Sequence, residues 1–346
     1  MSPKALIMCT NVRWKPHFAL LLAILWSISV TGQKDTLSFW DTPGSLHKGR
    51  FRAAAGTGLV VYTGAVIGLN ELWYKETDRT SFHFFNDMKE WQQMDKAGHM
   101  FTTYFESDWT YHVARWTGIN RKSSIWTGAL VAVGLQTTLE ILDGFSSDWG
   151  FSMYDMAFNL AGAGLWAGQQ AGWNEQRIRM KVSSTHSTYP QDPIMGQPSG
   201  TTTLMERTDD LFGENLLQSF LKDYNAQTIW MSVNLYSFMK EKSRFPKWLN
   251  LAIGYSGENM FGGFENKWEV DGNTFQTSDQ DYPRYKQFVF SPDIDLSKIN
   301  VRSRPLKMLL GMLNIFKFPA PALVINGHGG VEWEWLYFRG LRRVTD

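Results

Sequence analysis

Apolar and polar residues follow two different periods along this chain. Between residues 51 and 172, apolar residues recur at the spacing of one helix face, whereas after about residue 225 they recur at every second position. A period near 3.6 residues predicts helices, and a period of two predicts strands. We therefore expect an α+β protein, with an N-terminal bundle of about four apolar helices followed by a small antiparallel β-rich C-terminal region.

Turn and capping residues set the bounds of the predicted helices, which are expected at residues 51–74, 94–117, 122–143 and 152–172. The third helix follows Gly118-Ile119-Asn120, which is a turn signal. The fourth begins at Ser152, a suitable N-cap with Asp155 three residues later. Together the helices are expected to form one domain at residues 50–175.

Long uncharged stretches within three of these helices bear on their surroundings. The stretches are residues 53–69, 123–139 and 156–172, and their length is at the lower limit for a membrane span. They are rich in small residues, which allow helices to pack closely in lipid. A bundle buried in a water-soluble domain would contain similar stretches. The small residues and the tryptophans beside these stretches favour membrane association.

The second half of the chain has different signals. Residues 181–203 are rich in Ser, Thr, Pro, Gln and Gly, so a linker is expected at 176–224. The β-rich region is expected at 225–346, with strands near 229–235, 249–255, 288–296 and 321–338 and a short apolar helix at 306–316. Four or five strands are too few to close a membrane barrel from one chain.

The first 32 residues have the layout of a secretory signal peptide. Arg13 and Lys15 precede an apolar run at 18–30, and Val30-Thr31-Gly32 offers small side chains for cleavage. An uncleaved anchor is the alternative. The single cysteine, Cys9, precedes the apolar run, so it is not placed as the lipidated cysteine of a lipoprotein. The mature chain is therefore expected to lack disulfides and thiolate chemistry.

Charge and composition exclude some functions. The formal net charge of +1 gives no electrostatic footprint for nucleic acid, which is therefore not expected as a partner. The chain has no phosphate-binding Gly-x-x-x-x-Gly-Lys loop and no Gly-x-Ser-x-Gly nucleophile elbow. The aromatic content of 15%, with 16 tryptophans, fits either a membrane interface or bulky cores.

Ionisable side chains interrupt the apolar helices in three blocks. In the second predicted helix, Asp95 and His99 share one face, and Lys96 lies beside them. The third and fourth helices and the loop between them contribute Glu140, Asp143, Asp148, Ser152, Asp155 and Asn159. Charged groups inside an apolar bundle must pair, change protonation or bind a cation. These blocks are therefore the candidate functional site.

Three interpretations of this site remain open. It is a structural network in which Lys96 neutralises one acid and other acids cap helix ends. Alternatively, it holds a divalent metal such as Zn, Mn or Fe, with ligands drawn from His99, Glu140, Asp143 and Asp155. In the third interpretation His99 is a general acid or base, with Asp95 and Glu140 as further catalytic candidates. The candidates for binding a small-molecule ligand, whose identity the sequence does not give, are Lys96, Asp143, Asp148, Ser152, Asp155 and Asn159.

The three blocks also resemble a known family. The patterns in order are Asp95-Lys96-x-x-His99, Glu140-x-x-Asp143 and Ser152-x-x-Asp155-x-x-x-Asn159-x-x-Gly162. They resemble the VanZ-like family of small membrane proteins and, more closely, the YfiM-type family of predicted periplasmic (lipo)proteins in its Bacteroidetes form. VanZ-like proteins usually have Gln where Asp143 stands, followed by an Arg, which this chain lacks. The resemblance implies an envelope location and a shared site, but no reaction, since the YfiM-type family has no established activity.

The sequence therefore leads to two hypotheses about function. The first is a non-enzymatic envelope protein at the periplasmic face of, or within, the outer membrane, whose polar cluster is structural or binds a ligand. Membrane or outer-membrane proteins are its expected partners. The second is an enzyme, possibly metal-dependent, that acts on an envelope lipid or cell-wall precursor.

Overall fold

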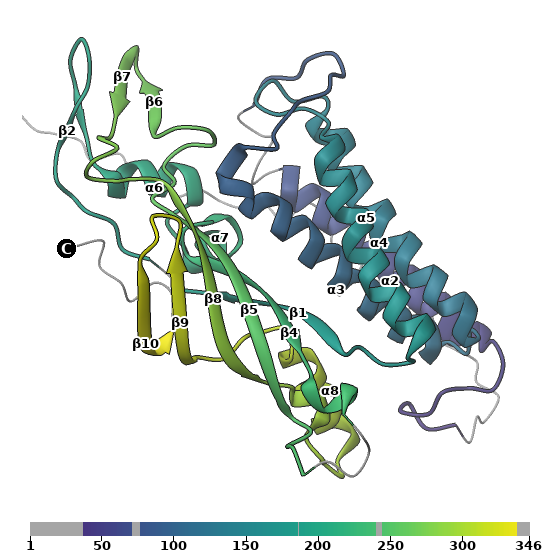
Figure 1. Ribbon diagram of the computed structural model, residues 1–346. Coiled ribbons are helices and arrows are strands. Elements are labelled where there is room, and N and C mark those ends of the chain that lie inside the picture. Colours follow the sequence, from purple (N-terminus) through teal and green to yellow (C-terminus); the bar gives the residue numbers. More distant parts are fainter. Residues whose placement is uncertain (1–36, 71–76, 186, 240–243, 338–346) are drawn as a thin grey trace, which may run out of the picture.

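The computed structural model describes residues 37–70, 77–185, 187–239 and 244–337. Its N-terminal half is a helical bundle and its C-terminal half is built mainly from antiparallel strands (Figure 1). The expected α+β class is thus confirmed. The signal peptide predicted at 1–32 lies outside the described residues.

Four long helices form the bundle. They are α2 (Lys48–Leu69), α3 (Met94–Trp116), α4 (Arg121–Asp143) and α5 (Met153–Gly172), and the 3-10 helix η2 (Glu90–Gln93) precedes α3. The bounds of α4 and α5 agree closely with the turn and capping residues of the sequence, because Asn120 and the predicted cap Ser152 cap these helices, whereas α3 begins without a side-chain cap. Asn120 accepts a hydrogen bond from the backbone N–H of Ser123, and the Ser152 hydroxyl accepts one from that of Asp155.

Glycines allow close contact between the helices of the bundle. A Cβ atom at Gly162 of α5 would lie 2.2 Å from the carbonyl oxygen of Met100 in α3. A Cβ atom at Gly128 of α4 would lie 2.6 Å from the carbonyl oxygen of Ser107, also in α3. Helix α3 is therefore held between α4 and α5 at distances that only glycine permits at these two points.

A six-stranded antiparallel sheet follows, with strand order β1-β4-β5-β8-β9-β10. Its strands are β1 (Ile178–Ser184), β4 (Gln227–Val233), β5 (Leu249–Glu258), β8 (Tyr285–Ile294), β9 (Ala320–Asn326) and β10 (Val331–Tyr337). The pairs β2 (Ile194–Met195) with β3 (Thr201–Thr202) and β6 (Lys267–Val270) with β7 (Asn273–Gln276) form two small sheets. The short helices are α6 (Leu204–Phe212), α7 (Leu216–Lys222), η3 (Leu235–Phe238), η4 (Leu296–Lys298) and α8 (Arg304–Leu313).

The segment expected as a linker, 176–224, is largely structured. Strand β1 lies within it and pairs with β4, and helix α6 begins at a capping box formed by Thr203 and Glu206. The sequence signal of β1 is weak, because its apolar side chains are only three, Ile178, Met180 and Val182, and they alternate with polar ones. Met180 and Val182 are buried. Those two side chains enter the main core against the bundle.

One face of the sheet carries apolar side chains in register. The central row, from β4 to β10, is Met231, Ile253, Phe290, Leu323 and Trp333. Near β1 the bundle covers this face, since Met180 and Ile229 pack in the core that α3 shares (Figure 1). Farther along the same face, Ile253 and Trp333 are 42% and 56% exposed. The bundle therefore covers only part of an apolar face.

The opposite face of the sheet is buried and carries both polar and apolar side chains. Asp293 of β8 accepts hydrogen bonds from Ser232 of β4 (2.6 Å) and from the ammonium of Lys181 in β1 (2.8 Å). Across this face, the Tyr337 hydroxyl of β10 lies 3.0 Å from that of Thr228 in β4. The sheet is therefore curled around an interior that combines these polar groups with a small hydrophobic core, which includes Trp230 and Val289, and its other apolar face is turned outward.

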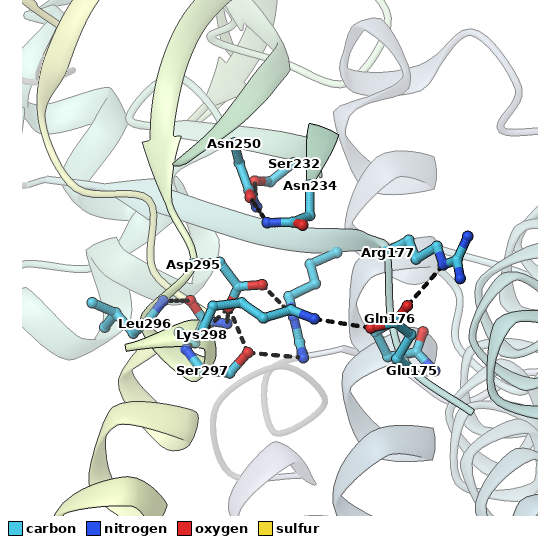
Figure 2. Close-up of polar contacts among 12 residues, drawn as sticks. Glu175, Gln176, Arg177, Ser232, Asn234, Asn250, Asp295, Leu296, Ser297 and Lys298 are labelled. Carbon is cyan, nitrogen blue, oxygen red and sulfur yellow. Dashed lines mark hydrogen bonds and ion pairs between the residues drawn. The ribbon is translucent and has the colours of Figure 1, made fainter. Parts of the chain in front are cut away.

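A network of ion pairs joins the end of the bundle to the sheet region (Figure 2). Glu175, between α5 and β1, accepts from Arg177 and from Lys298 of η4, both at 2.9 Å. Nearby, Asp295 accepts from the hydroxyl of Ser297 at 2.6 Å. The two halves of the chain are thus in contact through polar groups here as well as through the shared core.

Burial of Lys317 inside the curled sheet makes the stability of the folded protein depend on pH. Its ammonium lies 5.1 Å from the centre of the Trp230 ring, and burial lowers the pKa of Lys317 to about 8. Between that pH and the unfolded value near 10.4, the unfolded chain binds more protons than the folded one, so stability rises with pH. We expect Lys317→Met to be more stable than wild type at pH 7, by on the order of 3 kcal/mol. Thermal unfolding measured from pH 7 to 10.5 should show the stability difference between Lys317→Met and wild type shrinking as the pH rises. A difference that stays constant with pH would contradict the lowered pKa of Lys317.

Candidate functional site

The candidate site lies at one end of the helical bundle. Because α3, α4 and α5 are joined by short connections and run antiparallel, the start of α3, the end of α4 and the start of α5 meet at the same end. The three sequence blocks lie at these helix ends. The topology thus brings the blocks together.

Lys96 is at the centre of the cluster. Its side chain is fully buried, and its ammonium lies 2.7 Å from Asp87, 3.0 Å from Asp95 and 2.7 Å from Asp155. Burial alone would lower the pKa of Lys96, but the carboxylates of Asp95 and Asp155 raise it above its usual range. Lys96 is therefore a permanent cation that three carboxylates share.

The carboxyl groups around Lys96 differ in their electrostatics. Burial, and after it the charge of Asp95, raises the pKa of Asp155 to about 9. Burial would also raise the pKa of Asp95, but His99 and Lys96 hold it below its usual range. A pKa of about 9 leaves Asp155 protonated at neutral pH, so the ammonium of Lys96 faces two ionised carboxylates, Asp87 and Asp95, and does not compensate both.

His99 faces the same carboxylates from the next turn of α3. Its Nε2 lies 3.7 Å from Asp95, 3.6 Å from Glu140 and 3.8 Å from Asp155. Its other ring nitrogen, Nδ1, lies 3.2 Å from the side-chain oxygen of Asn159. Asn159 of α5 thus orients the imidazole, and Nε2 is directed at a group of acidic oxygens.

Glu140 and Ser152 connect α4 to the start of α5. One carboxylate oxygen of Glu140 accepts a hydrogen bond from the backbone N–H of Ser152 at 3.0 Å. The other oxygen, Oε1, is buried and has no hydrogen-bond partner among the described residues. Ser152 donates its hydroxyl proton to Asp87 at 2.6 Å while it caps α5. The cap of α5 is therefore also a part of the site.

Two further residues that the sequence groups with this cluster lie at different places. Asp143 lines the adjacent cavity. Asp148 lies in the exposed loop after α4, where it accepts a hydrogen bond from Thr77 at 3.1 Å. The residues brought into one cluster are Asp95, Lys96, His99, Glu140, Ser152, Asp155 and Asn159.

Several residues of the site carry no strong sequence signal. Asp87 lies before η2, outside any periodic segment, and Tyr224 lies in the expected linker, yet its hydroxyl donates to Asp95 at 2.8 Å. Glu90 is near both, and burial followed by the charge of Asp95 raises its pKa to about 7. Thr103, which donates to Asn159 at 3.1 Å, is four residues after His99. That helical spacing is the one signal that could have revealed it.

An unusual turn positions the start of α3. Trp91, Gln92 and Gln93 have φ values of 46°, 51° and 61°, so three successive residues adopt the left-handed conformation that disfavours side chains. The backbone N–H of Trp91 donates to the carbonyl of Gly263 at 2.7 Å, and the Tyr255 hydroxyl donates to the carbonyl of Gln92. Lys286 is also bonded to the side chain of Gln93. We call these three contacts the sheet clamp.

A cavity of about 600 Å³ opens beside the cluster. Asp95, His99 and Asp155 form part of its wall on the bundle side, and Phe212 and Phe220 from α6 and α7 line it on the other. The volume is in the range of small-molecule sites, and the lining combines apolar rings with a few converging polar groups. The arrangement is suited to a ligand or ion that carries positive charge.

Comparison with known proteins bears on part of the chain. Residues 83–167 match the model of a family described as predicted periplasmic lipoprotein (DUF2279). The matched segment contains the cluster from Asp87 to Asn159 and ends within α5. The chain has no match among curated proteins or among solved structures. The family's description supports an exported, envelope-associated location, although the only cysteine of this chain, Cys9, precedes the apolar run.

Proposed function

We propose that this protein is attached to the outer membrane through apolar surfaces of its bundle and sheet, and that it binds a ligand in the acidic cavity. The observation that carries the proposal is the distribution of polarity. In both halves of the chain, many charged and amide side chains are buried beside the hydrophobic cores, while many large apolar side chains are exposed. That distribution is expected of a protein whose surroundings are lipid rather than water.

The helices provide the first part of this support. Helices α2 and α4 are long and apolar enough to cross a membrane, and no residue of α2 is buried within the described chain. Leu59 and Val61 of α2 are 66% and 64% exposed. A helix that is apolar all round and lacks a protein neighbour on most sides is unstable in water, but it is stable in lipid.

The sheet region provides the second part. The exposed portion of its apolar face, including Phe290 and Trp333, continues from the surface that the bundle covers. Helix α8 also exposes Leu306, Met308 and Leu309. Lipid would cover these surfaces, and proteins of the same membrane would be the natural partners. An envelope location is supported because the matched family is described as predicted periplasmic and the N-terminus has the layout of a signal peptide, and we propose the outer membrane as the site of attachment within the envelope.

Fractionation of cells that express the full chain tests the attachment. We expect the protein in the outer-membrane pellet after a carbonate wash. Leu59→Asp should shift it toward the soluble fraction, because an aspartate at the centre of a membrane helix is unfavourable by about 3 kcal/mol. Met195→Asp is the matched control, since Met195 is equally exposed but lies in the small β2–β3 sheet. Release of the wild-type chain into the soluble periplasm would contradict the proposal.

A further inference from the structure

Four side-chain atoms from α3, α4 and α5 lie near one another beside the cavity. They are His99 Nε2 and one carboxylate oxygen each of Asp95, Glu140 and Asp155, at 3.6 to 3.8 Å from the nitrogen. These distances are too long for hydrogen bonds. The ligand atoms of Asp95, His99 and Asp155 all lie within 4.8 Å of one another, whereas a tetrahedron of ligands about 2.1 Å from a zinc ion has edges of roughly 3.4 Å. Small side-chain movements would complete such a shell.

The orientation of His99 is the second observation. With its Nδ1 proton donated to the side-chain oxygen of Asn159, the neutral ring presents the lone pair of Nε2 to the carboxylates. A lone pair that faces acidic oxygens is repelled unless a proton or a metal ion lies between them. Histidine ligands of metals usually donate their second ring nitrogen to a protein oxygen, as His99 does to Asn159.

Glu140 is the third observation. Its side chain is 1% exposed, and its Oε1 atom has no hydrogen-bond partner among the described residues. The atom is directed at His99 Nε2 rather than at Lys96. A purely structural network around Lys96 accounts for Asp87 and Asp95, but it leaves this buried oxygen unsatisfied.

We propose that His99, Asp95, Glu140 and Asp155 bind a divalent transition metal ion, an inference that rests on the ligand-binding part of the proposed function. Imidazole with carboxylates is typical of zinc, manganese and iron sites. The metal would supply the positive charge that Lys96 alone does not provide. The cavity beside His99 gives water or a small molecule access to any remaining coordination position.

Metal binding by the purified full chain in detergent tests this inference. The tag-free protein is stripped with a chelator and titrated separately with Zn²⁺, Mn²⁺ and Fe²⁺, with bound metal measured by mass spectrometry and calorimetry. We expect one equivalent to bind to wild type and none to His99→Gln or Glu140→Gln. Asn159→Leu, which removes the orienting oxygen, should weaken binding by about 10- to 100-fold.

Two matched controls accompany these variants. His112→Gln changes another histidine of α3 whose side chain is 68% exposed, and Asp78→Asn changes an exposed acid near the same end of the bundle. Both should bind metal as wild type does. Circular dichroism of each stripped variant establishes that it is folded.

The proposal would be overturned by a folded wild type that binds none of the three ions. Equal binding by wild type, His99→Gln and Glu140→Gln would also overturn it. Because the assay uses detergent-solubilised protein, it does not depend on cellular location. A soluble periplasmic protein that binds the metal would contradict only the membrane attachment, and a membrane-attached protein without metal would contradict only this inference.

Discussion

Lys96→Met is expected to destabilise the folded chain by about 3–5 kcal/mol, because removing one partner of a buried ion pair leaves the other charges uncompensated. The ammonium of Lys96 lies within 3.0 Å of Asp87, Asp95 and Asp155, and its side chain is fully buried. Methionine has a similar length but no charge, so the variant isolates the electrostatic contribution. Thermal and chemical unfolding of the stripped protein in detergent would measure it.

Two further variants distinguish this effect from a simple loss of packing. Adding Asp155→Asn to Lys96→Met should restore part of the stability, since it removes one of the uncompensated acids. Lys298→Met is the matched control, because Lys298 has a single carboxylate partner, Glu175, and both side chains are partly exposed. Its loss should change the free energy of unfolding by less than about 1 kcal/mol. Similar effects of the two lysine variants would count against the central role of Lys96.

The second large effect is expected at the contact between α3 and α5. Gly162→Ala should destabilise the bundle by about 1–3 kcal/mol, because the added Cβ would lie 2.2 Å from the carbonyl oxygen of Met100. That oxygen belongs to the backbone, so only a movement of one helix relieves the clash. Asn159 is one turn before Gly162 and is bonded to His99, so the same movement should disturb the imidazole.

Gly164→Ala is the matched control in the same helix. Nothing lies within 4 Å of a Cβ at Gly164, so alanine there should stabilise the chain by up to about 1 kcal/mol through its higher helix propensity. The two alanine variants are therefore expected to shift the unfolding midpoint in opposite directions. A stabilising Gly162→Ala would show that the two helices are not in the close contact described.

The sequence predicts the bundle well because its signals are local. Helical periodicity, the cap at Ser152 and the turn before α4 all act within a few residues, and they agree with the observed helices. The same spacing identifies Asp95, His99 and Glu140 before the fold is known. That they converge also follows from the sequence, because short connections make the helices antiparallel.

The rest of the site depends on contacts that no local pattern encodes. Tyr224 reaches Asp95 from a position 129 residues later in the chain. Asp87 lies in an irregular segment whose conformation depends on its neighbours. Asp148 shows the reverse case. The sequence groups it with the site because it is an acid close to Glu140 and Ser152, but it lies in an exposed loop. Sequence spacing shows which groups share a helix face, but not which loop folds back onto that face.

The left-handed turn before α3 has a thermodynamic consequence. Three successive residues in this conformation raise the free energy by roughly 1 kcal/mol or more each, and the contacts of the sheet clamp come from Tyr255, Gly263 and Lys286. These three residues lie beyond the segment 83–167 that matches the family. The conformation that places Asp95 and His99 is therefore stabilised by a part of the chain that contributes no candidate ligand to the metal.

Binding at the site and the integrity of the sheet are consequently linked equilibria. A ligand that contacts Asp95 and His99 favours the turn and thereby favours docking of the sheet onto the bundle. Such a coupling would be reciprocal. A ligand at the site would change the affinity of the sheet for a partner by the same factor as that partner changes the affinity of the site for the ligand. A variant that breaks the sheet clamp is thus expected to displace Asp95 and His99, although it lies far from them in the sequence.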